Sequence, residues 1–313
     1  MKLLFAYDGS ACADAAIDDL ARAGLPERGN AVVISVAEVW LPPPNGEPGG
    51  DATGIRLDRG TEERLKRHYE ANRQKVAEAE SMANAARDRL RNLLPQWEID
   101  AEATYGSPAW EILSRADDLK PDLIVVGSQG RSAIGRFFLG SISQKVLTEA
   151  RCSVRIARGR VEIEPMALRI VVGFDGSAGA QASVNAVAAR SWPADTEVRL
   201  FAVTEPVTPS TIGRFIPPLV DFVEEVNVSE REWIEKLADK ALDDLKTKGI
   251  AAGLFIYDGN PKNTLVEEAE NWGADCIFVG ANAFGSRLER FLLGSTSAAV
   301  GARAHCSVEV VRI

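Results

Sequence analysis

The chain has 313 residues, of which 46% are apolar and 26% charged, as in folded globular proteins and unlike disordered or collagen-like chains. It carries 36 lysines and arginines against 45 aspartates and glutamates, and the net charge of −9 disfavours nucleic acids and anionic membranes as partners. No apolar run is long enough to span a bilayer, and the first residues are typical of a buried strand rather than a signal peptide. With only four cysteines, these features predict a cytoplasmic protein with reduced thiols.

Short apolar runs alternate with longer stretches of helical periodicity. In the first half, strands are predicted near residues 2–7, 31–37, 98–104, 122–127 and 153–157. Helices are predicted between them, near residues 10–23, 61–93, 107–119 and 141–150. The long helix has apolar residues three or four apart from Leu65 to Leu93, which predicts one buried face. The second half repeats this order, with strands near 168–174, 197–203, 250–257, 275–280 and 307–312.

The two halves are copies of one another. Ala6-Tyr7-Asp8-Gly9-Ser10 returns 167 residues later as Gly173-Phe174-Asp175-Gly176-Ser177. Near the end of each copy, Arg136-Phe137-Phe138-Leu139-Gly140-Ser141 returns 154 residues later as Arg290-Phe291-Leu292-Leu293-Gly294-Ser295. Offsets that are constant within blocks and change between them indicate a duplicated domain with loop insertions and deletions. We therefore predict domain 1 over residues 1–158, a linker over 159–167 and domain 2 over 168–313.

Alternating strands and helices predict an α/β fold, a parallel sheet covered on both faces. Ligands of such sheets bind beyond the carboxyl ends of the strands, where the strand order reverses. One strand of domain 1 is followed by Asp8, another ends at Gly127, and Gly140-Ser141 opens the last helix. Glycines let a ligand approach the backbone, and the N–H groups of a helix N-terminus favour phosphate. Because Asp8 can accept a ribose hydroxyl or hold a metal carried by phosphates, the combination predicts a mononucleotide site.

The spacing of Gly127, Gly130, Gly140 and Ser141, within two five-strand copies, resembles the universal stress protein family over essentially the whole chain. The resemblance implies two Rossmann-like domains, of the adenine nucleotide alpha-hydrolase-like type, each with a five-stranded parallel sheet of order 3-2-1-4-5. It also implies a bound ATP, ADP or AMP, with Mg²⁺ arriving on the phosphates. The nucleotide-binding residues it implies in domain 1 are Ala6, Tyr7, Asp8, Val36, Gly127, Gly130, Gly140, Ser141 and Ile142.

Domain 2 departs from this pattern. Ala283 stands where the second glycine should be, and one extra residue precedes Gly294. Alanine is strained at positive φ, and its methyl group would crowd a phosphate. We expect domain 2 to bind nucleotide weakly, differently or not at all. Its degenerate site would comprise Asp175, Val203, Gly280, Gly285, Gly294, Ser295 and Thr296.

Several of these residues also have a purely structural interpretation. Ser141 followed by Gln144 matches a capping box, and Asp8 and Asp175 are typical of turns and helix caps. No catalytic residue and no protein-held metal is predicted. The chain has two histidines, and the P-loop, dinucleotide-binding and nucleophile-elbow patterns are absent from its sequence. The open alternatives are a nucleotide-binding stress-response or signalling module, an enzyme no faster than a slow ATPase, and a nucleotide-free scaffold.

The last strand of each copy would be an exposed sheet edge, which is an aggregation hazard. We therefore predict that residues 153–157 pair with Ser307–Arg312, so that the two domains form a pseudo-dimer within one chain. The family resemblance further implies a homodimer of chains.

Overall fold

The computed structural model describes residues 1–39, 59–129, 139–158, 167–205, 217–281 and 293–313. Of the predicted site residues, Gly130 and Gly285 lie outside these ranges, as does Ala283.

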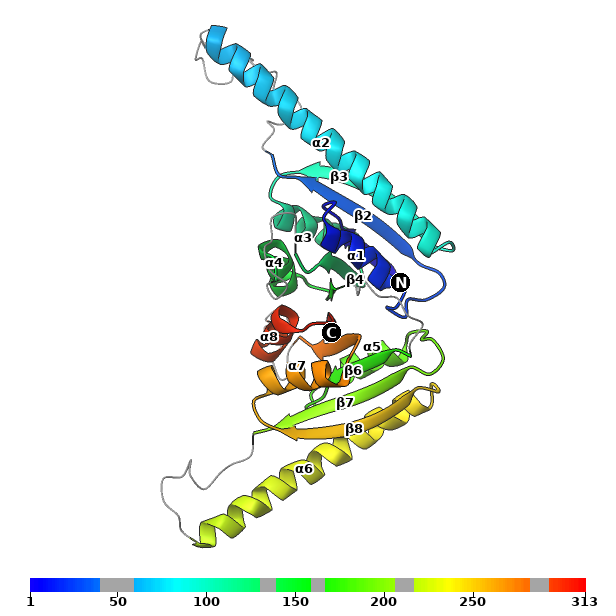
Figure 1. Ribbon diagram of the computed structural model, residues 1–313, viewed down its shortest axis with the longest axis vertical. Coiled ribbons are helices and arrows are strands. Elements are labelled where there is room, and N and C mark those ends of the chain that lie inside the picture. Colours follow the sequence, from blue (N-terminus) through cyan, green and yellow to red (C-terminus); the bar gives the residue numbers. More distant parts are fainter. Residues whose placement is uncertain (40–58, 130–138, 159–166, 206–216, 282–292) are drawn as a thin grey trace.

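Within the described residues, each copy has five strands and four helices that alternate along the chain (Figure 1). The elements of domain 1 are β1 (Lys2–Ala6), α1 (Ala11–Leu20), β2 (Asn30–Ala37), α2 (Arg59–Leu93), β3 (Glu98–Tyr105), α3 (Pro108–Leu119), β4 (Leu123–Gly127), α4 (Ser141–Glu149) and β5 (Ser153–Ala157). Those of domain 2 are β6 (Arg169–Gly173), α5 (Ala178–Ala188), β7 (Glu197–Thr204), α6 (Pro217–Lys246), β8 (Ala251–Asp258), α7 (Pro261–Trp272), β9 (Cys276–Gly280), α8 (Ser295–Arg303) and β10 (Ser307–Val311). The α/β fold is confirmed, and the strands of both domains and the helices of domain 1 lie close to the bounds predicted for them.

All ten of these strands join one sheet in the order β3-β2-β1-β4-β5-β10-β9-β6-β7-β8. Within each domain the order is 3-2-1-4-5 and the pairs are parallel, as the family resemblance implied. The central pair, β5 with β10, is antiparallel, with Arg155 opposite Glu309. The pairing predicted from the two edge strands is therefore present, and the chain forms a pseudo-dimer about this joint.

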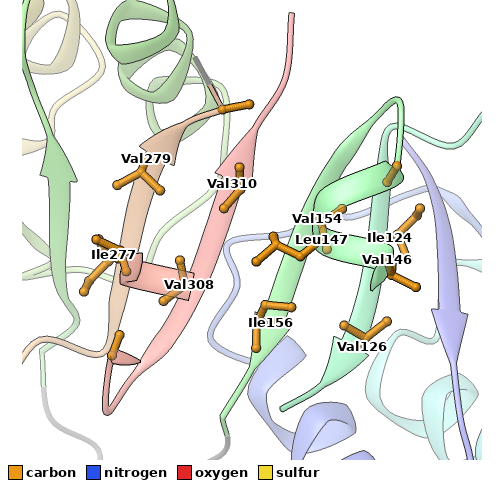
Figure 2. Packing of buried hydrophobic residues seen from close by; sticks show 14 of the residues in the cluster. Ile124, Val126, Val146, Leu147, Val154, Ile156, Ile277, Val279, Val308 and Val310 are labelled. Carbon is orange, nitrogen blue, oxygen red and sulfur yellow. The ribbon is translucent and has the colours of Figure 1, made fainter. Parts of the chain in front are cut away.

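Helices cover both faces of the sheet, but the apolar cores differ between the faces. On the face of α3, α4, α7 and α8, one continuous cluster crosses from domain 1 into domain 2. Val154 and Ile156 of β5 meet Val308 and Val310 of β10 at its centre (Figure 2). On the other face, α1 and α2 cover a core confined to domain 1, whereas α5 and α6 cover a separate core in domain 2. The two domains therefore share a core on one face only.

The prediction of one buried face along the whole of α2 is correct for its C-terminal part and wrong at its N-terminal end. Leu90, Ala86 and Ala79 are fully buried, whereas Leu65 is 47% exposed. The physical reason is length. A 35-residue helix is about 52 Å long, whereas the 8-residue strands beneath it span about 27 Å. The first turns of α2 therefore extend beyond the sheet (Figure 1).

No helix among the described residues is both long enough and apolar enough to cross a membrane.

Candidate functional site

The carboxyl ends of β1 and β4 lie side by side, because these two strands pair with Phe5 opposite Val125. Asp8 and Ser10 follow β1, and Gly127 is the last residue of β4. The hydroxyl of Ser10 donates to the carbonyl oxygen of Gln129 at 3.4 Å, which joins the segments that follow the two strands. The sequence-predicted residues Asp8 and Gly127 are thus on neighbouring strand ends, at the reversal of strand order where ligands of this fold bind.

The N-terminus of α4 is held against the end of β4 and has no side-chain cap. Its N-cap residue is Gly140, whose own N–H donates to the carbonyl oxygen of Ser128 at 2.8 Å. One turn further, the hydroxyl of Ser143 donates to the carbonyl oxygen of Gly127 at 2.7 Å. The N–H groups of the first turn, at Ser141 and Ile142, therefore lie beside the strand ends. No side chain of the described residues caps this end of the helix. Such a helix end attracts anions.

The capping-box interpretation of Ser141 is wrong, because Ser141 is the first helical residue and Gly140 is the cap. A side-chain cap is present instead at α1, where the Ser10 hydroxyl accepts from the N–H of Ala13 at 3.1 Å. The turn interpretation of Asp8 is confirmed for one oxygen. Its Oδ1 accepts from the N–H of Ser10 at 3.0 Å, and the side chain is half-buried. A structural role for Asp8 in this turn thus coexists with its place at the strand ends.

An apolar surface borders the strand ends. Ala6, Val36 and Ile142, all in the predicted site, are half-buried and pack against the core on the face of α3 and α4. Leu139, which the sequence analysis did not single out, also packs against this core. A combination of an apolar surface and an uncapped helix end suits a ligand with a flat apolar ring at one end and an anion at the other.

The ring of Tyr7 lies on the opposite face of the sheet from this apolar surface. It packs beside Phe5 with ring centroids 6.4 Å apart, and its hydroxyl donates to Oδ1 of Asp14 at 2.8 Å. The alternation of side chains along a strand explains the separation from Ala6. Tyr7 can therefore meet a ligand at the strand ends only through its backbone.

Gly127 has a packing role that the sequence analysis missed. A Cβ atom at this residue would lie 3.1 Å from the backbone of Cys12 in the first turn of α1. The glycine thus allows α1 to lie close against the end of β4, which brings the segments after the two strands together.

Burial raises the pKa of Tyr7 to about 12 from 10.0, assisted by the hydrogen bond and the negative charge of Asp14. Below pH 10 both the folded and the unfolded protein keep this proton. Between pH 10 and 12 only the unfolded protein releases it, so the stabilisation from Tyr7 is lost as the pH rises. We expect the free energy of unfolding to fall more steeply between pH 10 and 12 for the wild type than for Tyr7→Phe, because this range lies between the pKa of about 10.0 in the unfolded chain and about 12 in the folded protein.

Urea unfolding at a series of pH values measures this difference. Phe174 occupies the same position in domain 2, where it is buried, so the phenylalanine variant keeps a ring that the fold accommodates. If the free energy of unfolding depended on pH in the same way in the two proteins, the raised pKa of Tyr7 would be contradicted.

Domain 2 repeats the uncapped helix end. The N-cap of α8 is Gly294, whose N–H donates to the carbonyl oxygen of Ala281 at 2.7 Å. The hydroxyl of Ser297 donates to the carbonyl oxygen of Gly280 at 2.5 Å. Ser295 and Thr296 thus stand where Ser141 and Ile142 stand in domain 1. The backbone of the helix end is equivalent in the two copies.

The surroundings of that helix end differ in domain 2. Asp175 is exposed, although its Oδ1 accepts from the N–H of Ser177 as in the domain 1 turn. Val203 lies opposite Tyr257 in the sheet, and the ring of Tyr257 packs against Phe201 at 5.0 Å. The matching residue of domain 1, Val36, lies opposite Thr104. Aromatic rings therefore occupy the sheet surface beside Val203.

Across the residues that the structure describes, no three histidine, cysteine, aspartate or glutamate side chains gather into a metal-binding group.

The sequence model of the Universal stress protein family matches the chain twice, over residues 1–158 and 166–312. The chain belongs to the universal stress protein family. A universal stress protein of Thermus aquaticus is 36% identical over 156 residues, which cover 50% of this chain and 97% of that protein. A universal stress protein of Mycobacterium tuberculosis is 25% identical over 261 residues, covering 77% of this chain and 76% of that protein.

The fold of a solved universal stress protein from Archaeoglobus fulgidus matches that of the whole tandem. The match covers 99% of this chain and 96% of that one, with a TM-score of 0.59 and 19% sequence identity. Together with the two matches of the family model, this confirms the predicted tandem of two universal stress protein domains.

Proposed function

We propose that domain 1 of this universal stress protein binds an adenine nucleotide, ATP or its products ADP and AMP, and that the chain serves as a nucleotide-dependent module in a stress response or in signalling. The observation that carries the proposal is the uncapped N-terminus of α4, fixed by Gly140 and Ser143 against the end of β4 and next to the end of β1. Family membership supports it, because the glycine pattern of domain 1 matches that of the nucleotide-binding members.

Each part of the ligand has a matching part of the site. The first-turn N–H groups of α4 suit the phosphates, and the carboxylate of Asp8 suits a ribose hydroxyl. The half-buried side chains of Ala6, Val36 and Leu139 suit the adenine ring. Mg²⁺ would enter bound to the phosphates. We assign no catalytic residue, so any ATP hydrolysis would be slow.

Domain 2 is proposed to bind nucleotide weakly or not at all. Tyr257 and Phe201 crowd the sheet surface beside Val203 with aromatic rings, and Ala283 replaces a glycine of the pattern. Its role would be that of a scaffold that pairs with β5 of domain 1. If two chains also form a homodimer, they would use a surface other than β5 and β10, because these strands already pair within the chain.

Ser141→Asp is expected to weaken ATP binding by about tenfold or more, because a carboxylate would stand at the helix end that receives the phosphates. The same charge favours the N-terminus of the helix itself, so the fold is retained. Isothermal titration calorimetry with ATP and with adenosine measures the effect. Adenosine, which has no phosphate, should lose less than about threefold.

The matched control is Ser295→Asp at the equivalent position of domain 2. It should leave the affinity of the domain 1 site for ATP unchanged. Equal losses in the two variants would place the site elsewhere. If the wild type binds no nucleotide at millimolar ATP, and the purified protein releases none on denaturation, the nucleotide-free scaffold would replace this proposal.

A further inference from the structure

The joint between the domains brings equivalent positions of the two copies face to face. The last helix and last strand of domain 2 follow those of domain 1 at an offset of 154 residues. Arg155 therefore corresponds to Glu309, and these two residues lie opposite each other in the β5–β10 pair. Leu147 likewise corresponds to Gly301, and these two also meet, on the face of α4 and α8. The residue types at such equivalent positions therefore differ between a pair of unlike domains and a pair of identical ones.

One set of contacts across the joint is reciprocal. The N–H of Arg158 donates to the hydroxyl of Ser307 at 2.9 Å, and the N–H of Arg312 donates to the hydroxyl of Ser153 at 3.1 Å. Each arginine side chain also donates to a carbonyl oxygen near the end of the other domain's last helix, at 2.7 and 2.5 Å. Because both copies carry these residues, any two such domains could make this set of contacts.

A second set is not reciprocal. Four buried charged side chains form a row of alternating sign, in the order Asp19, Arg155, Glu309 and Arg190. Nε of Arg155 lies 2.7 Å from Oδ2 of Asp19, and its Nη1 lies 3.3 Å from Oε2 of Glu309. Arg190 pairs with the other oxygen of Glu309. The side chains of Arg155 and Glu309 are each 1% exposed.

Pairing a domain with a second copy of itself would break this alternation. Two copies of domain 1 would place arginine opposite arginine at the centre, with an aspartate on each side. Two copies of domain 2 would place glutamate opposite glutamate. The total charge stays balanced in both cases, but the two charges in direct contact are alike and lie in a site shielded from water, where their repulsion is strongest.

On both faces of the joint, a large side chain of one domain packs against a glycine of the other. A Cβ atom on Gly301 would lie 2.7 Å from Cδ2 of Leu147, so the leucine fills the space that the glycine leaves. Two leucines would overlap there, and two glycines would leave a void. On the opposite face, Gly24 has a φ of +62° and its bare Cα faces the ring of Trp192, 2.7 Å from the position of a Cβ atom. Each domain thus supplies one projecting side chain and one glycine gap.

We propose that this joint is a selective interface, at which each domain binds the other and rejects a second copy of itself. The inference does not depend on nucleotide binding. Its consequence is that a domain with the intact glycine pattern always pairs with a domain that lacks it.

The test begins with the full chain carrying a specific protease sequence inserted within residues 159–166. The folded protein is cleaved, unfolded in urea and refolded by dilution, and the products are weighed by native mass spectrometry. Unselective pairing would put about half of the molecules in same-domain pairs, whereas we expect fewer than about one in ten. Same-domain pairs near one half would overturn the proposal.

A second measurement, on the uncleaved chain, decides the matter if the halves fail to refold. Glu309→Arg with Gly301→Leu gives domain 2 the central residues of domain 1, and Glu309→Gln with Gly301→Ala is the matched control. The first double variant should have an unfolding equilibrium constant at least about tenfold larger than the control. Constants within about threefold of each other would show that the joint tolerates like residues and would overturn the proposal.

Discussion

Replacing Arg155 by methionine is expected to lower the free energy of unfolding by about 3 kcal/mol, in the range found when one partner of a buried ion pair is removed. The guanidinium is fully buried at the centre of the charged row. Burial by itself would lower the pKa of Arg155, but the negative charges of Asp19 and Glu309 outweigh it and hold the pKa above its ordinary value. Arg155 therefore stays charged, and methionine, which keeps much of the stem, removes that charge.

The carboxylates left behind explain the size of the effect. Glu309 keeps its ion pair with Arg190, whereas Asp19 loses its pair with Arg155 and keeps the hydrogen bond from Ser307 at 2.6 Å. A carboxylate that is 9% exposed and lacks its counter-charge is costly to bury.

Urea unfolding followed by circular dichroism measures this loss, with Arg231→Met as the matched control. Arg231 also pairs with a carboxylate, that of Asp258, but the two side chains are 45% and 52% exposed. Exposed pairs contribute about 0–1 kcal/mol, so the control should change little. Similar losses in the two variants would mean that water reaches the charged row.

Much of this architecture could be predicted from the sequence, because the strands and helices of an α/β domain have distinct periodicities and the duplication shows each of them twice. The charged row could not. A charged residue within a strand, such as Arg155, normally indicates a side that faces solvent. Only the alignment of the two copies, with Arg155 at the position of Glu309, offered a signal of a paired interior site.

The candidate site could be predicted in its backbone but not in its side-chain directions. Gly140-Ser141 indicated the start of the last helix, and α4 does begin there, with Gly140 as its N-cap. The side chains of Ala6 and Tyr7 point to opposite faces of the sheet, because side chains alternate along a strand. The family pattern names both residues but does not say which face each side chain occupies. The role of Gly127 depends on how closely α1 approaches β4, a distance between segments far apart in the chain.

Gly280→Ala is expected to cost about 3 kcal/mol, at the upper end of the usual penalty for overpacking. A Cβ atom on Gly280 would lie 2.4 Å from the carbonyl carbon of Gly179, in the first turn of α5. Backbone atoms cannot rotate out of the way as a side chain does, so α5 would have to move off the end of β9. Gly179 and Gly280 together set this close helix–strand approach.

The same substitution in domain 1 provides the matched comparison. Gly127 faces Cys12, the equivalent of Gly179, and the nearest backbone atoms are 3.1 Å from the Cβ position. A displacement of a few tenths of an ångström relieves that contact, so Gly127→Ala should cost about 1 kcal/mol. Gly249→Ala isolates the cost of positive φ alone, since Gly249 has a φ of +74° and nothing within 4 Å of its Cβ position.

Urea unfolding of the three variants ranks these costs. If Gly280→Ala were no more damaging than Gly127→Ala, α5 would be free to shift without loss. The helix–strand approach in domain 2 would then not be fixed by its pair of glycines. With the expected ranking, close packing of α5 is by itself a sufficient reason for the glycine at the end of β9. Its presence there, in a copy that has lost the second glycine of the pattern, then needs no bound nucleotide to explain it.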